Sequence, residues 1–191
     1  MTSTPSVATS VASRAAGHLK RAVAVTAGAL VVALAAQFAV PLPGTPVPMT
    51  LQPLAVLIVG GLLGPGYGAL SLMVYLEMGM VGLPVFTPLG APGLARLFGP
   101  TGGYLLAYPL AAALTGWLAR RAQGRVEMAG APLAGLVVIH LGGLAQLAVL
   151  SGSIATAAVA GSLPFLAGDL LKVAIAAVAL HRLLPLARAL R

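Results

Sequence analysis

Long apolar runs with almost no charge restrict what this sequence can fold into. It has 11 basic and 3 acidic residues, 14 in all among 191, while 59% of the residues are apolar. The mean hydropathy is +1.02. A water-soluble domain so poor in charge would expose large apolar patches, whereas lipid solvates such surfaces directly. We therefore expect a membrane protein with several spans.

The net charge of +8 does not indicate nucleic-acid binding, because the basic residues form small clusters at the ends of apolar runs. This distribution is typical of topology signals in membrane proteins. The chain has no cysteine, three histidines and three acids, so neither a metal site nor a cofactor is predicted. Segment 1–18 has no apolar core and is expected to be a disordered cytoplasmic tail.

Two of the apolar runs, 51–63 and 67–81, are shorter than the roughly 20 residues that a straight crossing needs. They flank Gly64-Pro65-Gly66 and form either one broken crossing or a hairpin of two short helices. The other runs are 19–40, 102–118, 132–150 and 163–184.

The distribution of positive charge favours the hairpin. With six spans, Arg96 and Lys172 are the only basic residues on one side, as the positive-inside rule requires, whereas five spans would break the rule. We predict an all-α bundle of six transmembrane helices over 19–184 with both termini cytoplasmic. The outer loops are 41–50, 82–101 and 151–162, the inner loops are 64–66 and 119–131, and the basic C-terminus is 185–191.

Three charged residues within the spans are Glu77, Asp169 and Lys172. Each costs roughly 2.5–3.5 kcal/mol near a helix centre and needs a partner or a polar cavity. Asp169 and Lys172 stand three residues apart and share one helix face, where they offer acceptors and donors to a ligand. Alternatively, Asp169 caps the helix start and Lys172 extends to the interface. Glu77 either touches the ligand or, as we favour, neutralises Lys172 or Arg96.

Arg96 lies in a long outer loop, and such loops often bind or cover ligands. Its guanidinium can hold a carboxylate by two parallel hydrogen bonds or can simply be exposed at the interface. His140, in the middle of a span, is expected to be neutral and hydrogen-bonded between helices rather than a proton relay. Motifs of metalloproteases, serine hydrolases and P-loop ATPases are missing, so no enzyme is predicted.

Four motifs follow one another in the sequence: GTPVPMTLQ at 44–52, GLPVF at 82–86, FGPTGGY at 98–104 and PFLAGDLLK at 164–172. Together they resemble the BioY family, the substrate-binding (S) components of energy-coupling factor (ECF) biotin transporters. The resemblance implies the S-component fold, a multi-pass protein of the cell membrane, and biotin as ligand. It also implies a transmembrane coupling (T) subunit and ATP-binding (A) subunits, whose ATP hydrolysis reorients the S component.

In the family, the Asp-x-x-Lys of the last helix contributes to the biotin site, which corresponds here to Asp169 and Lys172. A loop arginine resembles Arg96 in role. The resemblance implies that Asp169 accepts hydrogen bonds from the ureido N–H groups of biotin. Lys172 then donates to a ligand oxygen, and Arg96 holds the biotin carboxylate. Alternatively, Lys172 and Arg96 exchange these two ends of the ligand. Some family members also use an amide residue to bind biotin. This chain has no asparagine, so that contact is either absent or made by another residue.

Further roles follow from the same resemblance. Tyr104, Phe86 and Met49 are expected to supply apolar walls of the biotin site. Small residues of the first helix, Ala29 and Ala33, resemble the surface on which the family docks its coupling subunit.

Two other functions compete with this one. An S component for thiamine or riboflavin would favour aromatic platforms, and the single tryptophan, Trp117, lies at the inner end of a predicted helix. A membrane-embedded enzyme would have to use Glu77, Asp169 and His140, whose mutual distances the sequence leaves open.

Overall fold

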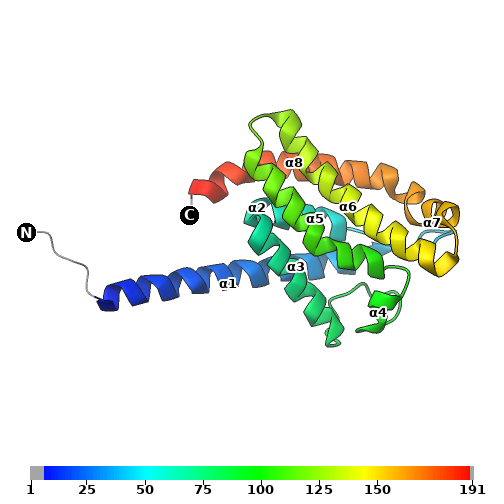
Figure 1. Ribbon diagram of the computed structural model, residues 1–191, viewed down its shortest axis with the longest axis horizontal. Helices are drawn as coiled ribbons and strands as arrows, with labels where there is room; N and C mark the ends of the chain where they lie inside the picture. Colours follow the sequence, from blue (N-terminus) through cyan, green and yellow to red (C-terminus); the bar gives the residue numbers. More distant parts are fainter. Residues whose placement is uncertain (1–6, 190–191) are drawn as a thin grey trace, which may run out of the picture.

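The computed structural model describes residues 7–189, with side chains described from 15 to 186. The helices form an elongated bundle, with the short helices α4 and α7 at one end (Figure 1). Its helices are α1 (Val7–Gln37), α2 (Gln52–Leu63), α3 (Pro65–Met80), α4 (Ala95–Phe98), α5 (Gly102–Arg121), α6 (Arg125–Ser151), α7 (Ile154–Gly161), η1 (Leu163–Phe165) and α8 (Leu166–Ala189).

Two short helices, α2 and α3, fold back on each other at Gly64. The φ angle of Gly64 is 83°, a left-handed conformation that favours glycine. Pro65 then begins α3 at a position where its missing N–H needs no partner. A Cβ on Gly68 would lie 2.9 Å from the Cα of Gly60, so the two helices are in close contact. The predicted pair of short helices is therefore present.

Glycines allow the helix backbones to touch at two places. A Cβ on Gly103 of α5 would overlap the carbonyl oxygen of Gly142 on α6. A Cβ on Gly60 of α2 would lie 2.5 Å from the carbonyl oxygen of Ala112 on α5. Close approach through small residues is typical of helix packing in lipid, where apolar burial alone does not drive association.

Long apolar segments and an apolar outer surface identify a membrane protein. By length and composition, three segments of the described chain can cross a membrane: Ala15–Gln37, Arg125–Ser151 and Ile154–Leu186. Large apolar side chains also face outward, among them Leu34, which is 66% exposed, and Leu110, which is 64% exposed. Water would make such a surface unfavourable, whereas lipid solvates it.

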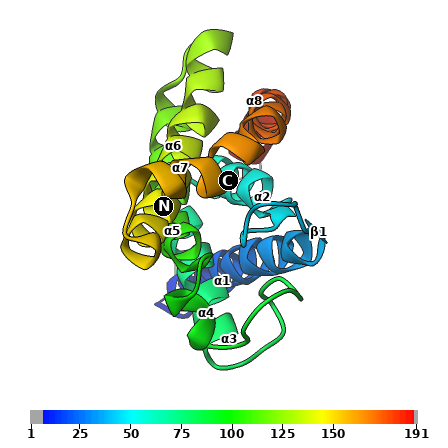
Figure 2. The same cartoon turned by 90° about the vertical axis from the view of Figure 1, so that its right-hand side faces the viewer.

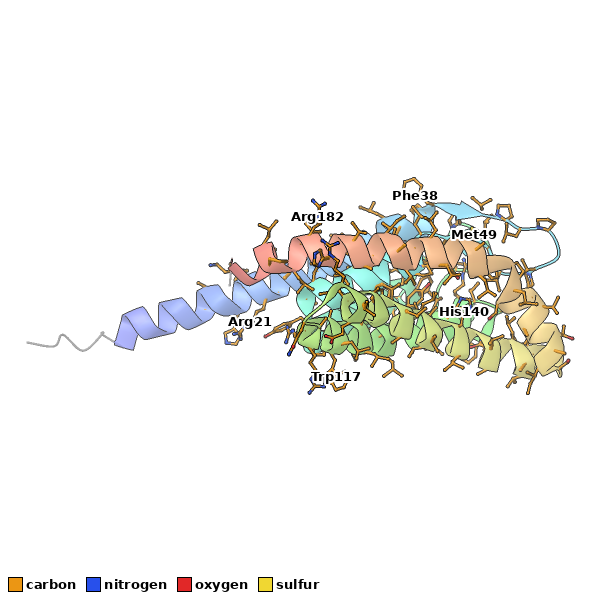
Figure 3. The ribbon with its side chains drawn as sticks, turned by 90° about the horizontal axis from the view of Figure 1, so that it is seen from above. Arg21, Phe38, Met49, Trp117, His140 and Arg182 are labelled. Carbon is orange, nitrogen blue, oxygen red and sulfur yellow. The ribbon has the colours of Figure 1, made fainter. Side chains whose placement is uncertain are left out.

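Basic side chains gather at the end of the bundle where α1 begins and α8 ends. Figure 3 labels Arg21 and Arg182 there, and it shows Met49 and His140 toward the other end. Of the described basic side chains, Arg96 and Lys172 belong to that other end. Figure 2 looks at this end directly, where α7, α4 and β1 lie around the loops.

The two ends of the chain differ from the prediction. Helix α1 begins at Val7, so much of the segment predicted as a disordered tail is helical. The extension is continuous with the apolar part of α1, and its four alanines and Arg14 favour a helix. Helix α8 likewise continues to Ala189, into the predicted C-terminal segment. Residues 1–6 and 190–191 lie outside the described residues.

The predicted loops also contain more structure than expected. Helix α6 begins at Arg125 and includes Pro132, so the inner loop is much shorter than predicted. Helix α7 fills most of the outer loop 151–162; its N-cap, Ser153, accepts a hydrogen bond from the backbone of Thr156. Strand β1 (Ala39–Val40) pairs antiparallel with β2 (Met49–Thr50) and closes the proline-rich loop.

Candidate ligand-binding site

A cavity lies at the loop end of the bundle, between the ends of α2, α5, α6 and α8. The space that the centre of a water molecule can occupy in this cavity is small, about 50 Å³, and the cavity is partly open to solvent. The walls are formed by Val47, Pro48, Thr50, Gln52, Pro53, Phe86, Thr87, Arg96, Thr101, Tyr104, Leu105, Tyr108, Ile139, His140, Phe165, Asp169 and Lys172.

Asp169 is the centre of a buried polar cluster in this cavity. Its Oδ1 accepts a hydrogen bond of 2.7 Å from Nζ of Lys172, and its Oδ2 lies 2.9 Å from Nε2 of His140. The other imidazole nitrogen, Nδ1, lies 2.9 Å from Oγ of Ser162. Asp169 is 4% exposed and Lys172 is 7% exposed. The cluster therefore joins α6 to α8 and to the segment before α8.

The two structural alternatives for the charged pair do not hold. Helix α8 begins at Leu166, so Asp169 lies within its first turn and is not the N-cap. Lys172 is buried against Asp169 and does not extend to the interface. The pair is held together inside the protein, where an unpartnered charge would be costly.

Arg96 mainly holds its own loop. Its Nε donates to the carbonyl of Ala91 at 2.7 Å, Nη2 donates to the carbonyl of Thr87 at 2.8 Å, and Nη1 donates to Oγ1 of Thr87 at 2.9 Å and to the carbonyl of Leu89. A guanidinium has five N–H donors, so one remains. Burial lowers the pKa of Arg96, with the nearby Tyr75 opposing the shift, and the guanidinium stays protonated. In this arrangement Arg96 can offer a ligand one hydrogen bond, not the two-bond clamp predicted from the sequence.

An amide side chain, Gln52, also lines the cavity, and the sequence analysis did not single it out. Gln52 is 4% exposed; its Nε2 donates to the hydroxyl of Tyr75 at 2.6 Å, and its Oε1 accepts from Oγ1 of Thr50 at 3.2 Å. It is the last residue of the GTPVPMTLQ motif. A polar residue ending a motif and opening an apolar helix was the available signal.

The predicted aromatic walls are at the cavity, whereas the predicted methionine is not. Phe86 and Tyr104 both line it. The ring of Tyr104 stands edge-on to His140, with centroids 6.3 Å apart, and its hydroxyl donates to the carbonyl of Gly161. Met49 lies in β2 beside Gly168, near the start of α8, outside the cavity wall.

Glu77 neither contacts the cavity nor neutralises Lys172 or Arg96, the two roles predicted for it. Its side chain is exposed on α3, it does not line the cavity, and it forms no ion pair within the described part of the chain. The carboxylate that neutralises Lys172 is Asp169. The loop carbonyls bind Arg96.

Ala29 and Ala33 are buried inside the bundle, with 0% and 7% exposure, so the prediction that they form a docking surface is wrong. Both belong to the main hydrophobic core. Beside them, a Cβ on Gly28 would lie 2.7 Å from Oγ of Ser71 on α3. The small residues of α1 therefore bring it close to α3 of the same chain.

The charges of the side chains that line the cavity do not sum to zero. Among the described side chains that line it, Lys172 and Arg96 are cations and Asp169 is the carboxylate. With a neutral imidazole at His140, their sum is +1. One negative charge on a ligand would make the sum zero, and buried charge is favourable only when it is compensated. The cavity therefore suits a small monoanion that also carries hydrogen-bond donors for Asp169.

Known proteins match this chain along most of its length. The BioY family matches over residues 6–189. A probable biotin transporter BioY of Pyrococcus horikoshii is 40% identical over 138 residues, which are 72% of this chain and 81% of that protein. The biotin transporter BioY of Thermotoga maritima is 37% identical over 142 residues, 74% of this chain and 83% of that protein.

A crystal structure of the S component for biotin from an ECF-type ABC transporter has the same fold. It superposes with a TM-score of 0.79 at 28% sequence identity and covers 87% of this chain and 92% of its own. Fold, motifs and relatives agree: the chain belongs to the BioY family.

Proposed function

We propose that this chain is the biotin-binding subunit of an ECF-type transporter for biotin uptake. The observation that carries the proposal is the buried cavity in which Asp169 pairs with Lys172 while Arg96 leaves one uncompensated positive charge. The names of the related transporters and of the matching S component support biotin as the ligand.

Biotin fits these walls chemically. Its ureido ring presents two N–H donors that point away from each other, one of which Asp169 can accept, and one carbonyl, to which Lys172 or the Gln52 amide donates. Its bicyclic thioether is apolar and packs against aromatic walls such as Phe86 and Tyr104. Its carboxylate supplies the single negative charge and accepts the remaining N–H of Arg96.

The competing vitamins fit less well. Thiamine is a cation and would raise the summed charge of the cavity from +1 to +2, whereas riboflavin is neutral and would leave Arg96 uncompensated. Trp117, the aromatic platform that a flat ring would need, lies on α5 far from the loop end (Figure 3).

A hydrolase is the second alternative, because Ser162, His140 and Asp169 are the residue types of a catalytic triad and are in contact. Lys172 already holds one oxygen of Asp169, and Ser162 does not line the cavity. A nucleophile must reach the bound substrate. These contacts therefore favour binding rather than covalent chemistry.

For the membrane arrangement, we propose six spans in the cytoplasmic membrane with both termini in the cytoplasm. The gathering of basic side chains at one end of the bundle supports this orientation. The cavity then opens outward, beneath loops 41–50 and 82–101. The sequence has no ATP-binding motif, so energy comes from coupling and ATP-binding subunits that reorient this chain and release biotin inward.

Calorimetry on detergent-purified protein tests the proposed function. The expected result is nanomolar biotin binding that is lost in Asp169→Asn and Lys172→Ala. The matched control is Glu77→Gln, which alters an exposed carboxylate outside the cavity and should leave affinity unchanged. Unchanged affinity in both cavity variants would refute the site, and tighter binding of thiamine or riboflavin than of biotin would refute the ligand.

A further inference from the structure

We infer that His140 is a positioning residue of the ligand site: it holds the carboxylate of Asp169 in the orientation that receives the ligand's N–H donors. The inference rests on the proposed function for the identity of the ligand. For this histidine the sequence predicts only a hydrogen bond between helices, without a role at the ligand. Figure 3 shows His140 on α6, inside the bundle and toward the loop end.

The contacts fix the place of one imidazole proton. Asp169 is ionised because it pairs with Lys172 at 2.7 Å, and an ionised carboxylate only accepts hydrogen bonds. The proton between His140 and Asp169 therefore belongs to Nε2. In the neutral ring, Nδ1 then accepts a hydrogen bond from the hydroxyl of Ser162, whose Oγ lies 2.9 Å away. In this tautomer both ring nitrogens are satisfied without a second positive charge next to Lys172.

The groups that face His140 come from three segments: Asp169 of α8, the ring edge of Tyr104 of α5, and Ser162. Lys172 and Arg96 line the same cavity and are both cationic. His140 is thus the neighbour of Asp169 on the side opposite Lys172.

Held in this way, Asp169 keeps acceptor capacity for a ligand. A carboxylate has about four lone-pair sites. Lys172 uses one site on Oδ1 and His140 uses one site on Oδ2. About two sites remain, one on each oxygen, and either can accept an N–H of the ureido ring. Without His140, Oδ2 would lose its fixed direction, and the carboxylate could turn toward Lys172.

Affinity measurements separate positioning from simple packing. His140→Phe keeps a ring of similar size but removes the donor, and biotin affinity should fall roughly 10- to 100-fold, the range of a lost hydrogen bond to a charged group. His140→Gln keeps an N–H donor at a similar reach and should remain within a few-fold of the unchanged protein. Equal affinities of the Phe variant and the unchanged protein, or equal losses in the Phe and Gln variants, would overturn the inference.

A spectroscopic measurement tests the tautomer without any ligand. The chain has three histidines, so ¹⁵N-histidine labelling gives few signals, and the signal lost in His140→Gln identifies His140. We expect a protonated Nε2 and an unprotonated Nδ1, with the Nδ1 signal shifting in Ser162→Ala. A neutral ring with its proton on Nδ1 would contradict the inference, because Nε2 would then have no proton to donate to Asp169. Absence of biotin binding in the unchanged protein would instead refute the proposed function.

Discussion

Replacing one member of the Asp169–Lys172 pair should destabilise the protein far more than replacing both. At 2.7 Å, two unit charges attract by about 6 kcal/mol at an effective dielectric constant of about 20. Desolvation of each buried ion opposes this attraction by several kcal/mol. The net stability of the intact pair is therefore small, whereas a remaining single charge keeps its full desolvation cost.

The two single variants should differ in severity. In Asp169→Asn, Lys172 has no other carboxylate among the described cavity walls, and we expect a loss of about 3–5 kcal/mol. In Lys172→Met, Asp169 keeps its hydrogen bond with His140, so the loss should be smaller. The double variant is neutral, and its stability should return close to that of the unchanged protein.

Thermal unfolding in detergent without biotin measures these differences. A loss of 3–5 kcal/mol corresponds to a fall in Tm of roughly 6–20 °C for a chain of this size. Glu77→Gln is the control and should leave Tm unchanged, because Glu77 is exposed. A double variant as unstable as Asp169→Asn, or an Asp169→Asn variant with the Tm of the unchanged protein, would refute the reasoning.

Three other predictions concern the loop, the helix contacts and the topology. In Arg96→Lys, the lysine cannot form the planar set of hydrogen bonds that the arginine forms in loop 82–101. Limited proteolysis of this loop should therefore become faster, and biotin affinity should fall roughly 10-fold. An unaltered cleavage rate would contradict this prediction. Gly103→Ala should lower Tm because its methyl group would overlap the Gly142 carbonyl, whereas the control Gly130→Ala, which meets nothing within 4 Å, should not. Gln123→Cys should react with a membrane-impermeant thiol reagent only from the cytoplasmic side, and labelling from outside would overturn the six-span arrangement.

The sequence predicts the features that depend on local spacing. Apolar runs broken by Pro and Gly located the main helices, since lipid requires long apolar segments with internal hydrogen bonds. A spacing of three residues placed Asp169 and Lys172 on one helix face, and they form an ion pair. Helix α7 was missed because its eight residues are too few for a clear periodic signal.

Features that depend on contacts between distant segments could not be predicted from the sequence. His140 and Asp169 are 29 residues apart in sequence, and only the packing of α6 against α8 brings their side chains together. The donors of Arg96 are used within its own loop, which depends on a loop conformation that the sequence does not specify. The family resemblance likewise assigned Ala29 and Ala33 to a docking surface, and only the packing of α1 within the bundle shows that both are buried.

The contact between Gly60 and Ala112 has a consequence for transport. It lies on the halves of α2 and α5 that are away from the cavity, and there the two backbones touch with no room for a side chain between them. The gap between these two helices is therefore closed on the side facing the turn at Gly64. A bound molecule has no straight passage between α2 and α5. Delivery to the opposite side of the membrane then requires these helices to separate or the bundle to change its orientation.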